Sequence, residues 1–253
     1  MTQSERTAYW YKWNAFQQKY ERYYTSKFYQ ALQIQVKAYI ATNDVVSIPS
    51  FPIYEVLLSL YKTCGPAWAR ITKVNVNKAD GQMGFNEDIV RLMQQYYGID
   101  LLNDAELMTQ HSREVIVKVL SDAAINGDSY DQIVGTLLKH PEFSRMRAMR
   151  IARTETVTAS NGAAIIYANQ SGLKLDKTWI AVKDKRTRHD HRNVTTNPIA
   201  IEEPFKVGDS YMMQPGVRTQ PDGQAVPAKE TVNCRCTIGF IPKRDASGRL
   251  IRT

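Results

Sequence analysis

The sequence contains few cysteines, no long apolar run and none of the short motifs that mark common enzyme classes. Its three cysteines, among 253 residues, are Cys64, Cys234 and Cys236. An odd number, with two of them only two positions apart, does not suit a disulfide framework, so a reducing compartment is expected. No run of about 20 apolar residues is present, and the first residues, MTQSERTAYWYKW, lack the apolar segment of a secretory signal. We therefore expect no membrane partner and no signal peptide.

The absence of catalytic motifs argues against an enzyme. There is no glycine-rich phosphate loop, no G-x-S-x-G turn and no H-E-x-x-H zinc motif. A hydrolase or nuclease could still use His191 with Asp184 or Glu155 as acid and base, and a transferase resembling ADP-ribosylating enzymes could use Arg153 and Glu155. Glu155 lies two residues from Arg153 in an arginine-rich stretch, which favours an ion-paired structural glutamate. We expect no catalytic residue and no small-molecule substrate.

The composition is that of a soluble protein with a basic surface. Hydrophobic residues make up 43% and charged residues 23%, and the length suits one large domain or two modest ones. The net charge of +8 favours an anionic partner, either double-stranded DNA or an acidic protein surface. The alternative is a solvated basic face without a partner. The candidate phosphate-contacting residues are Arg145, Arg147, Arg150 and Arg153 on one predicted helix, and Lys183, Lys185, Arg186, Arg188 and Arg192 in a later loop.

The first part of the chain has helical periodicity. Apolar and aromatic residues recur every three or four positions from Tyr9 to Tyr39, which predicts one helix from Ser4 to about Asn43. This aromatic helix is either a core helix of a bundle or a face that docks on another subunit.

Further helices are delimited by caps and breakers. We predict one helix at 54–60, ended by Gly65-Pro66, and a second at 85–97, ended by Gly98, with a loop at 75–84 between them. A third helix, at 103–125, is opened by a capping box and is apolar nearly all round at 115–120. Two more helices follow, at 129–138 and from Pro141 to about Gln170.

After Gly172 the pattern changes to short strands and long loops. Residues 177–183 alternate as in a strand, residues 194–224 are rich in Asn, Pro and Gly and predict a long loop, and residues 231–241 predict a closing strand. The sequence therefore predicts an α+β fold. A mainly helical region with a long first helix, residues 1–172, would precede a small α+β domain with few short strands, residues 173–253.

Metal-ligating residue types gather in this second region. On a strand, Cys234 and Cys236 would point to the same face, and His191 and Asp184 could approach them from the preceding loop. Thiolate, imidazole and carboxylate are the ligands of zinc, and a small loop-rich domain gains stability from a structural metal. The alternative is a packed pair of thiols with His191 and Asp184 bonded to arginines, so no cofactor is assigned beyond a structural zinc as one option.

The same residues carry a family resemblance. The pattern D-x-R-T-R-x-x-H follows a tryptophan-bearing strand and precedes N-C-R-C, in the order Trp179, Asp184, Arg186, Thr187, Arg188, His191, Asn233, Cys234, Arg235 and Cys236. Upstream stand Ile151-Ala152-Arg153-Thr154-Glu155, Asn161 and Gly172. Over residues 145–242 the chain resembles the phage Mu F-like family of minor head, or head morphogenesis, proteins. We expect a structural network of Arg153, Glu155, Trp179, Arg188, Asn233 and Arg235.

The resemblance implies a low-copy minor head protein of a tailed bacteriophage, at the portal or the capsid interior. It implies assistance in procapsid assembly, with DNA packaging or ejection as further options. The implied partners are the portal protein, capsid or scaffold proteins and double-stranded DNA; the implied locations are the virion and, during assembly, the host bacterial cytoplasm. The alternatives are a DNA-binding accessory protein without sequence preference and, third, a nuclease or ADP-ribosyltransferase-like enzyme delivered with the genome.

Overall fold

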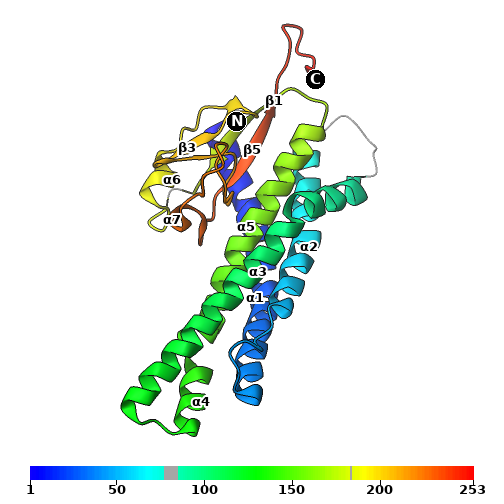
Figure 1. Ribbon diagram of the computed structural model, residues 1–253. Helices are drawn as coiled ribbons and strands as arrows, with labels where there is room; N and C mark the ends of the chain where they lie inside the picture. The colour runs from blue at the N-terminus through cyan, green and yellow to red at the C-terminus, as the bar shows by residue number, and fades with distance from the viewer. Residues whose placement is uncertain (77–84, 183) are drawn as a thin grey trace. The chain divides into compact units, whose positions relative to one another are not determined.

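The computed structural model describes residues 1–76, 85–182 and 184–253, and its fold is α+β as predicted (Figure 1). The helical elements are α1 (Gln3–Thr42), α2 (Phe51–Val76), α3 (Phe85–Asn126), α4 (Tyr130–Lys139), the 3-10 turn η1 (Pro141–Phe143), α5 (Arg145–Gln170), α6 (His189–Asn193) and α7 (Ala228–Thr231). The strands are β1 (Leu175–Ile180), β2 (Ile199–Ala200), β3 (Phe205–Val207), β4 (Ser210–Met212) and β5 (Thr237–Pro242). None of the described helices combines the length and apolarity needed to cross a membrane.

The chain forms two compact units, each built from segments that are distant in the sequence. The terminal unit contains Met1–Tyr20, Tyr61–Gln95 and Arg153–Thr253, and the middle unit contains Glu21–Leu60 and Tyr96–Ala152. The expected division into residues 1–172 and 173–253 follows the change in secondary structure instead, and it stays a prediction.

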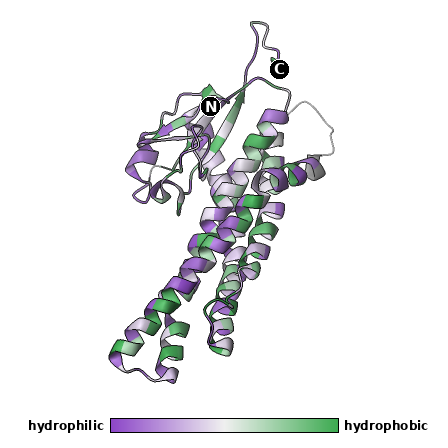
Figure 2. Cartoon of the chain, viewed as in Figure 1, coloured by the Kyte–Doolittle hydropathy of each residue, from purple (hydrophilic) through white to green (hydrophobic). Residues whose placement is uncertain are grey.

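The aromatic stripe of α1 is largely buried. In the terminal unit Trp13 has no exposed surface, and in the middle unit Tyr24, Phe28 and Leu32 are at most 1% exposed. Hydropathy along the helices alternates accordingly between apolar and polar residues (Figure 2). Burial of this stripe supports the core-helix interpretation, because a docking face would be open to solvent. Tyr11 and Tyr23, 63% and 58% exposed, are the aromatic residues of α1 that solvent reaches most.

Gly65 and Pro66 do not end a helix, contrary to the prediction, because α2 continues through both to Val76. A Cβ at Gly65 would lie 3.2 Å from the carbonyl oxygen of Ala159 and 3.2 Å from Cβ of Ala163, both on α5. The glycine is therefore needed for the close approach of two helices. Tertiary packing offsets the main-chain hydrogen bond that Pro66 cannot donate.

Helix α3 also continues where an interruption was predicted. Neither Gly98 nor Asn103 marks a boundary in Phe85–Asn126. A glycine within a helix costs only about 1 kcal/mol relative to alanine, so a long helix tolerates it. The apolar run at 115–120 is not buried all round either, since Ile116 is fully buried while Val117 is 49% exposed.

Several predicted helix ends are confirmed. Gly127 and Gly172 follow α3 and α5 with φ of +73° and +65°, the left-handed conformation that glycine adopts at helix ends. Ser129 and Gln132 form the predicted capping box of α4. Pro141 instead opens the short turn η1, and α5 begins at Arg145. Of the predicted loop at 75–84, residues 75 and 76 belong to α2, and the others lie outside the described residues.

The terminal unit contains two small antiparallel sheets. The first has the strand order β2-β1-β5, so β1 lies in the centre, and β5 pairs with it from Leu175↔Pro242 to Ile180↔Thr237. The second is the hairpin β3–β4. This hairpin and β2 correct the prediction of one long loop at 194–224. The closing strand begins at Thr237, later than predicted, and β1 ends at Ile180, while Lys183 lies outside the described residues.

Candidate functional site

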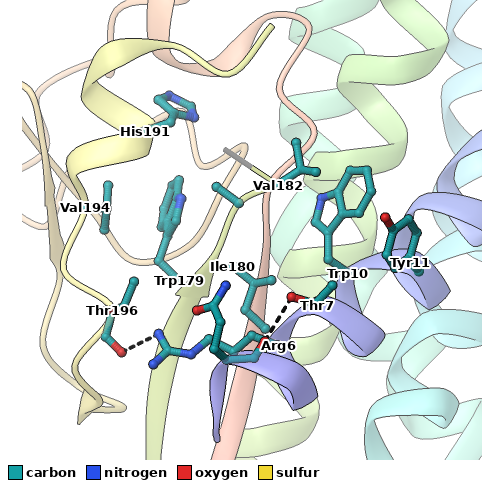
Figure 3. A pocket seen from close by; sticks show the side chains of 12 residues that line it. Arg6, Thr7, Trp10, Tyr11, Trp179, Ile180, Val182, His191, Val194 and Thr196 are labelled. Atoms are coloured by element: carbon teal, nitrogen blue, oxygen red, sulfur yellow. Dashed lines mark hydrogen bonds between the residues drawn. The ribbon is translucent and has the colours of Figure 1, made fainter. Parts of the chain in front are cut away.

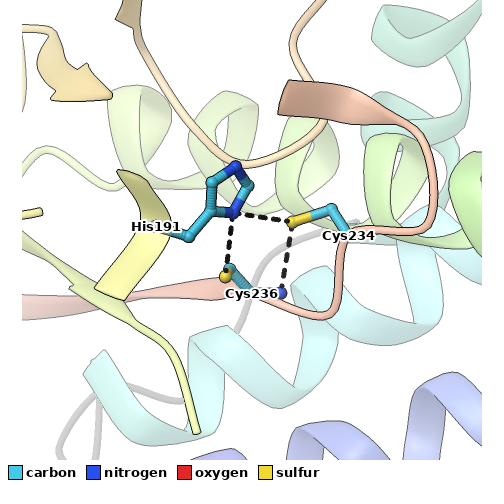
Figure 4. A group of neighbouring side chains, drawn as sticks. All are labelled: His191, Cys234 and Cys236. Atoms are coloured by element: carbon cyan, nitrogen blue, oxygen red, sulfur yellow. Dashed lines mark hydrogen bonds between the residues drawn. The ribbon is translucent and has the colours of Figure 1, made fainter. Parts of the chain in front are cut away.

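His191, Cys234 and Cys236 converge in the terminal unit (Figure 4). Nδ1 of His191 lies 3.4 Å from Sγ of Cys236 and 3.6 Å from Sγ of Cys234. One potential ligand atom from each residue lies within 4.8 Å of the others, and the three residues are at most 4% exposed. The predicted convergence is thus present in the structure.

The two cysteines reach this position from a loop rather than from a strand. Both precede β5, and Asn233 before them has a φ of +59°, an uncommon conformation for a residue other than glycine. Two hydrogen bonds hold this turn. Arg153 Nη1 donates to the side-chain Oδ1 of Asn233 at 3.3 Å, and the main-chain N–H of Asn233 donates to Thr154 Oγ1 at 3.1 Å. Helix α5 therefore fixes the conformation that places the thiols.

Glu230 completes the cluster, and sequence reasoning missed it. Its Oε2 lies 3.0 Å from Nε2 of His191, and both side chains are 2% exposed. A proton on Nε2 donated to this carboxylate leaves the lone pair of Nδ1 facing the two sulfur atoms. No motif pointed to Glu230; its position four residues before Cys234 is the one sequence signal.

The surroundings of the cluster shift the pKa values of the two thiols in opposite directions. The pKa of Cys234 is well below the ordinary thiol value because Cys236 donates a hydrogen bond to it and His191 adds another bond and positive charge. The hydrogen bond to Cys234 and burial raise the pKa of Cys236. Burial alone would lower the pKa of His191, but the hydrogen bond and charge of Cys234 raise it.

Asp184 lies outside this cluster. Its carboxylate accepts two bonds from Arg235, at 2.7 and 2.9 Å, and a third from Thr187 Oγ1 at 3.0 Å. Among the described residues, the group of possible metal ligands contains only His191 and the two cysteines. Asp184 instead forms the ion pair with an arginine that the alternative interpretation expected.

The expected structural network is divided over several contacts. The carbonyl oxygen of Arg235 accepts bonds from the indoles of Trp10 and Trp13, at 3.3 and 3.1 Å, and Arg188 donates to the carbonyl of Val232. The ring of Trp179 meets that of His191 edge-on, with centroids 5.5 Å apart. These contacts fix the loops on both sides of the cluster.

Glu155 is held separately, in a buried ion pair. Nη2 of Arg218 lies 2.7 Å from both carboxylate oxygens, and the Tyr61 hydroxyl donates at 3.0 Å. Glu155 is 2% exposed, and burial raises its pKa to about 7. The ion pair predicted for this glutamate is present, and its arginine is Arg218 rather than Arg153.

Two cavities border His191. One, of about 230 Å³, is lined by all three cluster residues and by four arginines; its lining comprises Arg153, Val182, Arg186, Thr187, Arg188, His191, Asn233, Cys234, Arg235 and Cys236. The other, of about 150 Å³, lies between Trp10, Trp179 and His191 (Figure 3). The first cavity is the one that combines possible metal ligands with positive charge.

The predicted phosphate-contacting residues differ in exposure and lie in both units. Arg147 is 5% exposed, and its guanidinium bonds the carbonyls of Glu142 and Met108, so it does not reach the surface. Exposed members are Arg145, Arg150, Lys185, Arg186 and Arg192. Arg153 and Arg188 line the larger cavity and are half-buried. Lys183 lies outside the described residues. DNA binding by this set stays a prediction.

Curated relatives match part of the chain. Uncharacterized protein YqbB of Bacillus subtilis (strain 168) is 31% identical over 137 residues, covering 53% of this chain and 43% of that protein. Minor head protein GP7 of Bacillus phage SPP1 is 29% identical over 128 residues, covering 50% and 40%. NAD(+)–arginine ADP-ribosyltransferase EFV of Enterococcus faecalis (strain ATCC 700802 / V583) is 33% identical over 119 residues, covering 44% and 22%. The chain thus matches less than half of the length of each.

Comparison with solved structures gives no significant match. The family model described as Phage Mu protein F like protein matches residues 114–239, a range that includes Glu230 and the three cluster residues. Over these residues, just under half of its length, the chain is similar to the Phage Mu protein F like family.

Proposed function

We propose that this chain is a minor head protein of a tailed bacteriophage, associated with the portal or the capsid interior, that assists procapsid assembly. The match of residues 114–239 to the family carries this proposal. The similarity to Minor head protein GP7 of Bacillus phage SPP1 supports it. The proposed partners are the portal protein and capsid or scaffold proteins, and the proposed location is the virion, after assembly in the host bacterial cytoplasm.

The environment of the candidate acids supports a structural role over a catalytic one. Glu155 is buried against Tyr61 and Arg218, and Asp184 is engaged by Arg235. The ring of His191 bonds Glu230 and the two thiols instead of these carboxylates. These contacts favour a structural role for Glu155 and Asp184 over an acid–base role with His191.

Head assembly in the presence and absence of the chain tests the proposal. The chain is co-expressed with the portal, scaffold and major capsid proteins of its phage, and assembled heads are purified and analysed by quantitative mass spectrometry. We expect a few copies per head, together with the portal. Heads that form with normal yield and contain no copy of the chain would contradict the proposal.

ADP-ribosyl transfer is a second candidate, favoured by one relative's name. That relative, EFV, is matched over 22% of its length. Incubation of the chain with labelled NAD⁺ and an arginine-rich acceptor protein decides between the two. We expect no transfer of label. Transfer that disappears in a folded Glu155→Gln variant would instead assign an enzymatic function.

A further inference from the structure

We propose that His191, Cys234 and Cys236 bind one zinc ion whose fourth coordination position opens into the arginine-lined cavity and accepts a phosphate oxyanion. This goes beyond the proposed head function, since neither the family match nor the relatives' names mention a metal or a phosphate. The proposal has two parts, the metal centre and its open position, and each is tested separately.

The two nitrogen–sulfur distances in the cluster fit a shared tetrahedral ion. Zinc binds thiolate sulfur at about 2.3 Å and imidazole nitrogen at about 2.0–2.1 Å, which at tetrahedral angles places sulfur and nitrogen about 3.6 Å apart. The two observed Nδ1–Sγ separations are 3.4 and 3.6 Å. The cluster therefore needs little rearrangement to bind the ion.

The surroundings supply the outer contacts that metal sites need. Glu230 engages Nε2 of His191 at 3.0 Å, which orients Nδ1 toward the sulfur atoms in the carboxylate–histidine–metal arrangement. The main-chain amide of Cys236 donates to Sγ of Cys234 at 3.4 Å, a bond that stabilises a ligating thiolate. A dry cluster of packed thiols would not require a buried carboxylate behind the histidine.

The fourth position faces the larger cavity, because all three ligand residues line that cavity. Among the described residues, no fourth His, Cys, Asp or Glu joins the group of possible ligands. Arg153, Arg186, Arg188 and Arg235 also line the cavity. Arg235 is paired with Asp184, so the positive charge that would face an anion comes mainly from the other three arginines. A phosphate is small enough for about 230 Å³, and arginine suits its geometry. The phosphate could be free or could belong to the end of a DNA strand.

Metal content of the full-length chain tests the centre. The chain is purified under reducing conditions with zinc in the growth medium, freed of loose metal, and analysed by elemental mass spectrometry. We expect one zinc per chain. Replacement by cobalt(II) should give the strong visible absorption of a tetrahedral site together with sulfur-to-cobalt charge transfer. A folded chain without stoichiometric zinc and without this spectrum would overturn the proposal, whatever the behaviour of variants.

Variants test the ligand set. Cys234→Ser, Cys236→Ser and His191→Ala should each lose bound zinc, whereas Glu230→Gln should retain it with roughly 10–100-fold weaker affinity. Cys64→Ser, which alters a buried cysteine elsewhere, and Asp184→Asn serve as controls and should keep one zinc. Loss of zinc from Asp184→Asn together with retention in His191→Ala would contradict the assignment.

Titration of the cobalt form tests the open position. Inorganic phosphate, a 5′-phosphorylated oligonucleotide and the same oligonucleotide with a 5′-hydroxyl are added in turn. A saturable spectral change with phosphate alone indicates a site for small anions, and a change with the phosphorylated oligonucleotide alone indicates DNA ends. Arg186→Ala should weaken either response. A spectrum unchanged by all three additions would overturn this second part of the proposal.

Discussion

Lys177 is a cation inside the terminal unit. It lies on the central strand β1 with 0% of its surface exposed, and its ammonium donates to the carbonyl of Met213 at 2.9 Å. Burial lowers its pKa to about 8, although the charges of Glu202 and Glu203 act in the opposite direction. A buried lysine of this kind makes the stability of the fold depend on pH.

The sign of this dependence follows from proton counting. Between pH 8 and about 10.5 the unfolded chain keeps the proton that the native chain has lost, so stability rises with pH, by on the order of 3 kcal/mol over the interval. The free energy of unfolding of the natural chain minus that of Lys177→Met should therefore increase from pH 8 to pH 10, as measured by urea titration. Lys174→Met, which removes an exposed lysine nearby, controls for net charge. A difference independent of pH would contradict the prediction.

At the residue scale, the sequence predicted part of the candidate site. The convergence of His191 with the two cysteines was predicted, although on the assumption of a strand that the structure replaces by a loop. Asp184 was grouped with them because carboxylates ligate metals, but a bidentate arginine holds it elsewhere. Glu230 was missed because its contact to His191 depends on how α6 and α7 are placed, which no local pattern encodes.

At the scale of elements, glycines in two long helices have different roles. Gly65 is surrounded by Met93, Ala159 and Ala163, whereas a Cβ at Gly98 would have no neighbour within 4 Å. From the sequence both looked like helix ends. The prediction rested on the low helix propensity of glycine. The helices continue because packing along their length outweighs that local propensity.

Substitution of these glycines should give opposite results. Gly65→Leu inserts a side chain between α2 and α5 and should destabilise the chain by about 1–3 kcal/mol or more. Gly98→Ala should stabilise it by about 0.5–1 kcal/mol, because alanine restricts the unfolded chain at no steric cost. Thermal unfolding followed by circular dichroism measures both. An unchanged melting temperature for Gly65→Leu would show that the two helices do not pack as closely as described.

The first helix offers a second comparison. Trp13 is fully buried, and its indole donates to the carbonyl of Arg235. Its ring packs against that of Trp68, with the two ring centroids 4.8 Å apart. Trp13→Ala should therefore cost about 3–5 kcal/mol. Tyr11→Ala, at a position 63% exposed, should change stability by about 0.5 kcal/mol. Chemical denaturation of both variants checks the prediction, and equal effects would revive the interpretation of this helix as a docking face.

At the scale of the whole molecule, the net charge of +8 remains the feature that most favours a nucleic-acid partner. Because Arg147 is buried, the candidates for contact with DNA phosphates are exposed residues such as Lys185 and Arg186. Periodicity predicted the α+β class and most helices, but not the two compact units, because each joins segments separated by 35 or more residues. Local sequence patterns do not indicate which distant segments pack together.

Binding to DNA should depend on salt and not on base sequence. Fluorescence anisotropy with labelled duplexes of unrelated sequence should show affinity falling linearly with salt on logarithmic axes, since phosphate contacts release counterions. Lys185→Ala combined with Arg186→Ala should reduce that slope by about 2, whereas Lys118→Ala with Lys139→Ala, which removes the same charge from exposed helix positions, should change it less. Affinity that is equal at low and high salt would exclude this mode of binding.

The bonds from Trp10 and Trp13 to the carbonyl of Arg235 link the start of the chain to a residue near its end. During synthesis on the ribosome, the first helix is complete long before Arg235 has been added. Until Arg235 has emerged, these indoles lack their acceptor and stay uncovered or bound by a chaperone. A chain terminated before Arg235 would leave the two indoles without this acceptor permanently, so cellular proteases could distinguish such a copy from a folded one.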